Sequence, residues 1–133
     1  MDNVLQGITP FNVLSKEKSH FHKGTEGAIQ LPRCDETETL SLSLQSIGFG
    51  CELYDDIQPV IYGKLLLNLN NAINALANIP LKEELENKAY RKILAAAMRE
   101  WLAVCKHQNK LLVTSSPVPA KLIPIILLSL IHI

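Results

Sequence analysis

The feature that most constrains the fold is a long amphipathic pattern between Leu81 and Gln108. Apolar residues recur there at three-and-four spacing and form one continuous stripe: Leu85, Tyr90, Ile93, Leu94, Ala97, Met98, Trp101, Leu102 and Cys105. A helix with such a stripe must bury it against another apolar surface. The pattern therefore predicts one long helix within a helical domain, and Asn109 is a suitable residue to end it.

A second helical pattern precedes this one, between Ile57 and Leu76. Asp56 is a plausible N-cap, because its carboxylate can accept hydrogen bonds from the free amide groups of the first turn. Pro80 disfavours helical geometry in the residue before it, and so it should separate the two helices. The tail contains Pro117, Pro119 and Pro124 and should run irregularly before any short helix begins.

The first 55 residues have a different composition. Short runs of β-type residues alternate with turn residues such as Gly24 and Gly27, which predicts strands and a hairpin. The run DETETLSLSLQSIGFG fits a helix capped by Asp35 or Thr37 and ended by Gly48, although its LSLSL segment also alternates like a strand. A short strand, CELYDD, should follow. We therefore expect an α+β chain with two parts, residues 1–55 and 56–133.

Composition narrows the class of protein. The 133 residues suffice for one modest domain or a piece of one, and 47% of them are hydrophobic. Thirteen basic residues balance thirteen acidic ones, which argues against a nucleic-acid or anionic membrane partner. Three cysteines without a CxxC pair, no signal peptide and no apolar run of about 18 residues predict a reduced, cytoplasmic protein. The apolar segment 122–133 should be a buried segment rather than an anchor.

The most informative polar residues lie on the first predicted helix. Lys64, Asn68 and Asn71 fall within about 60° of one another on a helical projection, with apolar residues on both sides. Asparagine is a weak helix former, so helix propensity does not explain these residues. Two interpretations stay open, because the stripe could bond to a neighbouring element or face a ligand.

A ligand-facing stripe would have a definite chemistry. A lysine in a partly apolar cleft can stabilise negative charge on a carbonyl oxygen and deliver a proton to it, which suits carbonyl reduction. Other candidates are weaker. His20 and His22 share a strand face but lack a third ligand at a matching spacing, so we expect no metal site. The acidic cluster Glu83, Glu84 and Glu86 should form a solvated face at a helix start.

Several segments resemble the ketopantoate reductases (2-dehydropantoate 2-reductases). The run DDIQPVIYGKLLLNLNNAINAL resembles the start of their helical C-terminal domain, where DDI is followed by W-x-K-L and by an asparagine four residues after the lysine. GITPFNVL and FHKGTEGAIQL resemble the last strands of the family's NADP-binding, Rossmann-like domain. PVPAKLIPIILLSL resembles its proline-rich stretch. The resemblance runs in the family's order over nearly the whole chain.

The resemblance implies an NADPH-dependent enzyme that reduces ketopantoate, or a related 2-keto acid, to the 2-hydroxy acid for pantothenate and coenzyme A synthesis. It makes Lys64 the catalytic proton donor and Asn68 a substrate-binding residue. The family's second asparagine, eight residues after the lysine, is replaced by Ala72, and Asn71 is expected to substitute for it. Tyr62 stands at the usual tryptophan.

The chain also departs from the family by what it lacks. The glycine-rich NADPH motif of the Rossmann core and the later serine and glutamate of the substrate site are missing. We therefore interpret the chain as an internal fragment, inactive alone: the tail of the NADP-binding domain (1–55) and the truncated start of a helical substrate or dimerisation domain (56–133). The alternative is a non-catalytic helical module for dimerisation or partner binding. Unpaired strand edges should make the isolated chain poorly soluble or dimeric.

Overall fold

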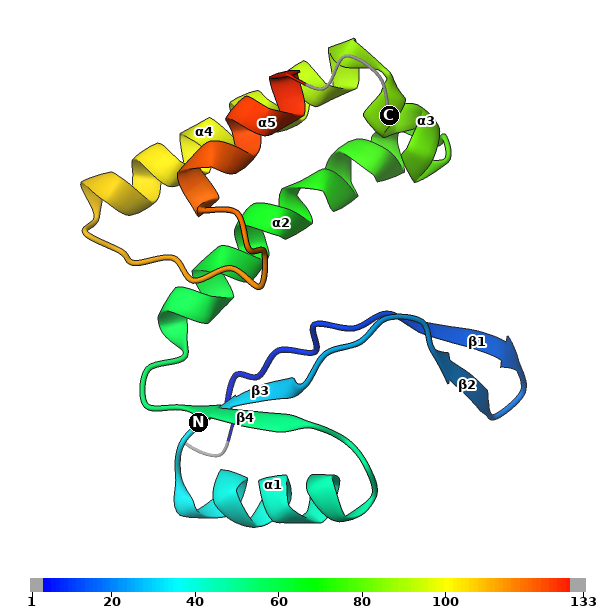
Figure 1. Ribbon diagram of the computed structural model, residues 1–133, viewed down its shortest axis with the longest axis vertical. Coiled ribbons are helices and arrows are strands. Elements are labelled where there is room, and N and C mark those ends of the chain that lie inside the picture. The colour runs from blue at the N-terminus through cyan, green and yellow to red at the C-terminus, as the bar shows by residue number, and fades with distance from the viewer. Residues whose placement is uncertain (1–3, 130–133) are drawn as a thin grey trace. The chain divides into compact units, whose positions relative to one another are not determined.

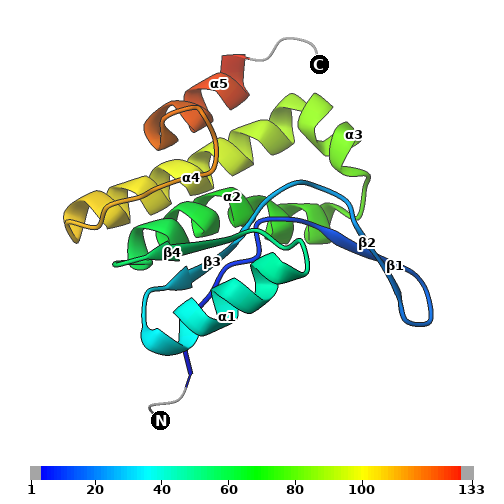
Figure 2. The same ribbon diagram turned by 60° about the horizontal axis from the view of Figure 1, so that its bottom comes forward.

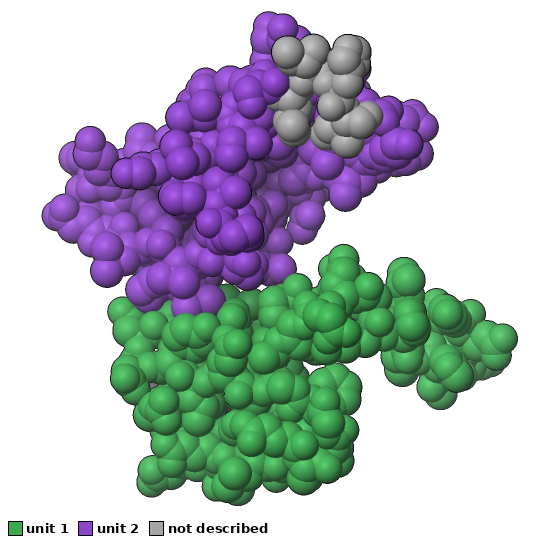
Figure 3. All heavy atoms as spheres, in the orientation of Figure 1, with its two compact units in different colours: residues 1–57 green, residues 58–133 purple. Residues whose placement is uncertain are grey.

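A computed structural model describes residues 4–129 of the chain. The chain is α+β, with several helices and two small sheets. It divides into two compact units, Met1–Ile57 and Gln58–Ile133, coloured separately in Figure 3. Each unit is described by itself below.

The first unit contains a β-hairpin. Strands β1 (Val13–Glu17) and β2 (His20–Lys23) pair antiparallel, with an irregularity between Ser15 and Glu17. Ser19 turns the chain between them with a φ of 66°. The hairpin expected from the turn residues is therefore confirmed, and its tight turn lies at Lys18 and Ser19 rather than at a glycine.

The same unit contains a β-α-β crossover. Strand β3 (Ile29–Pro32) pairs parallel to β4 (Cys51–Tyr54), and helix α1 (Asp35–Ser46) connects them and packs against β4 (Figures 1 and 2). The helical interpretation of the LSLSL segment is confirmed, and so is its end at Gly48, which has a φ of +83°. The predicted caps were wrong, because Cys34 occupies the N-cap position.

Helix α1 packs through small polar residues instead of its leucines. Thr37 and Ser41 are its buried residues, and the Thr37 hydroxyl donates a hydrogen bond of 2.6 Å to the Pro32 carbonyl. Leu40 and Ile47 remain exposed. The apolar stripe of α1 is therefore only partly covered within this unit.

The second unit is helical. It consists of α2 (Gln58–Ala77), α3 (Leu81–Glu86), α4 (Lys88–His107), a short 3-10 turn (Ala120–Leu122) and α5 (Ile123–Ser129). The first predicted helix is confirmed within one residue at each end. The single helix predicted over 81–108 was wrong, because Asn87 interrupts it. The Asn87 side chain accepts a 2.8 Å hydrogen bond from the Ala89 amide and so caps a new helix, α4.

The end of α4 and the irregular tail agree with the sequence. Asn109 adopts a φ of 52°, and the following Lys110 amide donates a 2.8 Å bond to the Cys105 carbonyl, which ends the helix as predicted. The proline-rich stretch runs without regular structure until Ala120. The apolar segment expected to be buried is buried only in part: Pro124 of α5 is buried, whereas Ile125 is 54% and Ile126 41% exposed, and residues 130–133 lie outside the described residues. No helix in the described part of the chain has the length and apolar character to cross a membrane.

The core of the second unit forms between α2, α4 and α5. Leu66, Leu94 and Met98 are buried at its centre, and half-buried apolar residues from the tail, including Ile123 and Leu127, pack against them. The Trp101 indole donates a 3.1 Å hydrogen bond to the Tyr62 carbonyl and so ties α4 to the first turns of α2. These contacts fix the part of α2 that carries Lys64.

Gly63 precedes Lys64 at a close approach between two segments. The Val113 carbonyl lies where a Cβ atom at position 63 would be, and the Val113 amide donates a 2.9 Å bond to the Pro59 carbonyl. Only glycine allows the tail to lie against α2 at this distance. The backbone next to Lys64 is therefore held by the tail segment.

Candidate functional site

The predicted polar stripe lies on the side of α2 that faces away from the core. Leu66, with Leu69 and Ile73, packs into the core of the second unit, whereas Lys64 and Asn68 lie about half a turn around the helix. Lys64 is half-buried, and both Asn68 and Asn71 are exposed. Residues three and four apart on a helix have Cβ atoms about 6 Å apart, so the three side chains could contact one small ligand.

None of the three stripe residues bonds to another described residue. Within residues 4–129, Lys64 forms no ion pair or hydrogen bond, and the Asn68 and Asn71 amides form no hydrogen bond. Within the described residues, these three side chains therefore do not tie α2 to a neighbouring element.

Asn74, on the same helix, shows what a structural asparagine does here. Its Nδ2 donates to the Ile79 carbonyl at 3.1 Å and to Glu84 Oε2 at 2.6 Å, and it thereby ties α2 to α3. The four asparagines of α2 therefore differ in role. Asn70 belongs neither with the exposed asparagines nor with Asn74, because its Oδ1 is buried but has no hydrogen-bond partner among the described residues.

The solvated acidic face predicted for Glu83, Glu84 and Glu86 was wrong at Glu84. This side chain is 1% exposed, and its Oε1 is buried without a hydrogen-bond partner in the described range, while Oε2 accepts the bond from Asn74. The position of Glu84 at the start of a helix did not predict that its side chain is buried. The signal that sequence reasoning missed was Asn74, a poor helix former whose amide requires a partner once it is buried.

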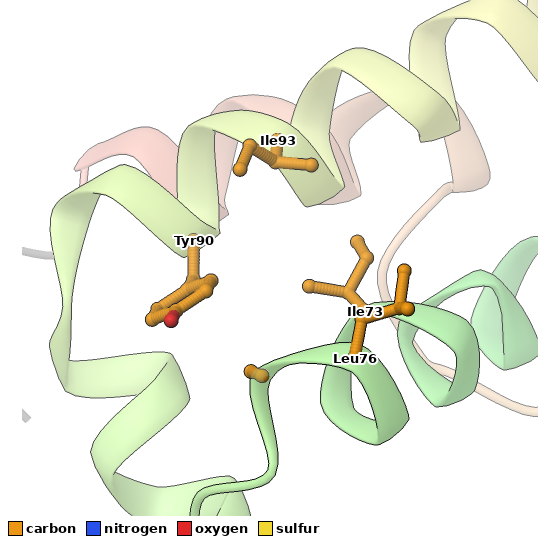
Figure 4. Close-up of a pocket in the computed structure, with 5 residues that line it drawn as sticks. Ile73, Leu76, Tyr90 and Ile93 are labelled. Atoms are coloured by element: carbon orange, nitrogen blue, oxygen red, sulfur yellow. The ribbon is translucent and has the colours of Figure 1, made fainter.

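An apolar pocket lies on the α2–α4 pair, and the sequence did not predict it. Its volume is about 210 Å³. Ile73 and Leu76 of α2 lie across it from Tyr90 and Ile93 of α4 (Figure 4), and Ala77 completes the lining. No lining residue is charged, so the pocket suits an apolar group and not the carboxylate of a 2-keto acid.

His20 and His22, the two histidines considered as metal ligands, belong to the first unit. Both lie on β2 and are exposed. Within residues 4–129, no three His, Cys, Asp or Glu side chains form a group that could hold a metal ion.

The first unit does not fit the pyrophosphate of NADPH. The turn after the parallel strand β3 leads into α1, whose first turn carries Asp35, Glu36 and Glu38. These carboxylates repel an anion where a dinucleotide site requires a glycine-rich turn. The nearby Arg33 already has a partner, because its Nε donates a 2.8 Å hydrogen bond to Asp55 Oδ1, and this bond raises the pKa of Arg33 above its usual value.

No family model, curated protein or solved structure matches this chain. The ketopantoate reductase family therefore enters the functional argument only through the sequence motifs described above.

Proposed function

We propose that the chain is part of an oxidoreductase of the ketopantoate reductase type, in which α2 binds a 2-keto acid. The observation that carries the proposal is the unpaired stripe of Lys64, Asn68 and Asn71. Three polar side chains that share a helix face and bond to no described residue are available to a ligand. Lys64 and Asn68 stand at the positions at which the family resemblance implies a proton donor and a substrate-binding amide, and Asn71 lies one residue before the family's second asparagine position.

Lys64 would act at the keto oxygen of the substrate. As the carbonyl carbon is reduced, negative charge develops on this oxygen, and the Lys64 ammonium stabilises the charge and donates a proton to form the hydroxyl. Solvent then returns a proton to the neutral amine. The half-buried position of Lys64 supports this role, because partial exclusion of water strengthens the interaction with the oxygen.

Asn68 and Asn71 would orient the substrate. Each amide offers two donor hydrogens, which can hold the keto or carboxylate oxygen of a 2-keto acid beside Lys64. Ala72 cannot supply the polar contact that the family resemblance implies at that position. We therefore propose a 2-keto acid as the substrate class and ketopantoate as its first candidate.

The overall reaction implied by the resemblance uses NADPH. Because the described residues do not fit the pyrophosphate, the proposal assigns to this chain only the proton-donating and substrate-orienting part of the site. The three free cysteines, Cys34, Cys51 and Cys105, support a reducing, cytoplasmic compartment.

The decisive experiment is the substitution Lys64→Ala in a longer polypeptide that supplies the rest of the reductase. Loss of a positioned proton donor should lower kcat by at least about 10²-fold. Steady-state kinetics with ketopantoate would measure the effect, and the change in KM should be small by comparison.

Lys88→Ala is the matched control, because Lys88 is an exposed lysine of α4, lies outside the stripe and has no ion pair or side-chain hydrogen bond among residues 4–129. Its kcat should stay within a factor of two of the unsubstituted enzyme. Near-normal turnover of Lys64→Ala would disprove the catalytic role of Lys64. Equal losses of kcat in the two variants would show that the effect comes from removing a positive charge and not from the position of Lys64.

A second candidate function is the non-catalytic helical module. The observation that favours it is the uncharged pocket between α2 and α4, which offers no chemistry to a 2-keto acid. The two functions use different sides of α2 and can be tested separately.

A further inference from the structure

The carboxyl group of Glu84 is buried without the positive partner that such a group normally has. Glu84 is 1% exposed, and its Oε1 has no hydrogen-bond partner among the described residues. Within residues 4–129 Glu84 forms no ion pair, and Arg91, the buried arginine of the same unit, donates to backbone carbonyls of α3 and α5. Buried carboxylates are stable when they are paired or bind a cation. Oε1 is therefore available to a positively charged group.

A second buried oxygen without a partner lies on the adjoining turn of α2. Asn70 precedes Asn74 by four residues, so the two side chains leave the same side of α2 with Cβ atoms about 6 Å apart. Asn74 bonds to Glu84 on α3, which lies at the C-terminal end of α2 (Figure 1). The Oδ1 of Asn70 is buried and has no hydrogen-bond partner in the described part of the chain. We call Asn70, Asn74, Ile79 and Glu84 the α2–α3 junction.

The α2–α3 junction contains more hydrogen-bond acceptors than donors. Asn74 Nδ2 uses both its hydrogens, on the Ile79 carbonyl at 3.1 Å and on Glu84 Oε2 at 2.6 Å. Pro80 follows and has no amide hydrogen to add. The Ile79 carbonyl keeps a second lone pair beside the carboxylate. Several oxygens around one buried carboxylate are the ligands that hard cations prefer.

The charge and the position of the junction specify the class of cation. Its one carboxylate balances a single positive charge. Within residues 4–129 no three His, Cys, Asp or Glu side chains gather into the kind of ligand set that zinc or calcium requires. Helix α2 ends at Ala77 and has no basic residue in its last turn, so the negative end of its dipole also favours a cation there. These features fit a small monovalent cation.

We propose that a monovalent cation of the size of Na⁺ or K⁺ binds at the α2–α3 junction, with Glu84 Oε1 and Asn70 Oδ1 as its side-chain ligands. The Ile79 carbonyl and water complete its coordination. The cation neutralises the buried carboxylate and thereby stabilises the packing of α3 on α2. The inference is independent of the proposed catalytic role of Lys64.

Thermal unfolding of the full chain in different chloride salts tests the proposal. The melting temperature is measured by circular dichroism over a series of NaCl or KCl concentrations, and choline chloride keeps the ionic strength constant. The choline cation is too large for the junction. With at least one of the two small cations, the melting temperature should rise and saturate, by about 5 °C when the salt reaches about ten times its Kd.

Three variants locate the effect. Glu84→Gln removes the charge but keeps an acceptor for Asn74, and its melting temperature should be the same in all three salts. Asn70→Ala removes one ligand and should raise the salt concentration for half-maximal stabilisation at least about tenfold, which tests the site even if Glu84→Gln does not fold. Glu83→Gln makes the matched change at an exposed position of the same helix and should keep the wild-type response.

Two results would overturn the proposal. The first is a wild-type melting temperature that does not depend on which cation is present, as expected if Asn70 turned its amide hydrogens towards Glu84. The second is a wild-type salt response in Glu84→Gln or in Asn70→Ala, which would place the bound cation elsewhere on the chain.

Discussion

Arg91 and Glu84 show how single side chains hold the helical unit together. Both have ionisable side chains and both are buried, at 5% and 1% exposure. The Arg91 guanidinium donates to the carbonyls of Leu85 and Glu86, each at 2.7 Å, and to that of Leu127 at 3.0 Å. One side chain thus satisfies the end of α3 and links it to α5, where the free carbonyls of a helix terminus require donors.

Replacing Arg91 should therefore be costly. Arg91→Met keeps the apolar stem but removes every donor to three carbonyls, and we expect the free energy of unfolding to fall by about 3 kcal/mol. Urea denaturation followed by circular dichroism measures this change. Arg99→Met is the control, because Arg99 is exposed on the same helix and should change stability by less than about 0.5 kcal/mol. Equal stability of the two variants would show that the Arg91 hydrogen bonds contribute nothing net.

The helical periodicity of apolar residues predicted which of them pack in the core, but it did not predict the burial of ionisable side chains. Trp101, Leu94 and Met98 were predicted from the stripe and lie in the core. The burial of Glu84 depends on Asn74, ten positions away on a different helix, and no local pattern encodes that pairing. The face of Lys64, Asn68 and Asn71 followed from helix geometry, whereas their lack of partners was visible only in three dimensions.

At the scale of the elements, capping chemistry explains the break between α3 and α4. A single helix was predicted by extending the apolar stripe from Tyr90 back to Leu85, but these two residues lie five positions apart, about 140° on a helical projection, so the phase of the stripe changes at the break. Asn87 has a φ of −82° and a ψ of 116°, which is extended and not helical backbone, and its side chain satisfies the Ala89 amide. A side chain that can replace a backbone partner lets the chain leave the helix and begin another.

The cap can be tested by the same substitution at two asparagines. Asn87→Ala removes the acceptor for the Ala89 amide and should lower the free energy of unfolding by about 1 kcal/mol. Asn71 is an exposed residue inside α2 and forms no side-chain hydrogen bond to the described residues. Asn71→Ala should therefore raise the free energy of unfolding by about 0.5 kcal/mol, because alanine has the higher helix propensity. Thermal unfolding by circular dichroism gives both values. A gain in stability for Asn87→Ala would mean that a continuous helix competes with the observed break.

At the scale of the whole molecule, each unit contains only part of what the family resemblance implies. The first unit has one parallel strand pair with a crossover helix, and β4 has no second strand partner among the described residues. Its helix start is acidic, as described above. The change of composition near residue 55 was enough to predict a boundary from the sequence. That the start of α1 does not suit the pyrophosphate of NADPH could be judged only from the structure, which places the acidic first turn of α1 directly after β3 and Arg33 beside Asp55.

The chain alone should not bind NADPH. Without a glycine-rich turn, and with carboxylates at the start of α1, nothing in the described first unit holds the pyrophosphate. Titration of NADPH against the purified chain, followed by Trp101 fluorescence and by calorimetry, should show no saturation up to about 1 mM, the weak end of specific affinity. Saturable micromolar binding would contradict this prediction and would indicate a cofactor site of a different kind.

The close approach at Gly63 affects how substitutions near the stripe are interpreted. A side chain at position 63 would collide with the Val113 carbonyl and push the tail away from α2, whereas a side chain other than lysine at position 64 should leave the fold intact and remove only the proposed proton donor. In a saturation scan scored by activity, the two neighbouring positions would look equally intolerant. A scan scored by protein abundance would separate them, because only position 63 would remain intolerant.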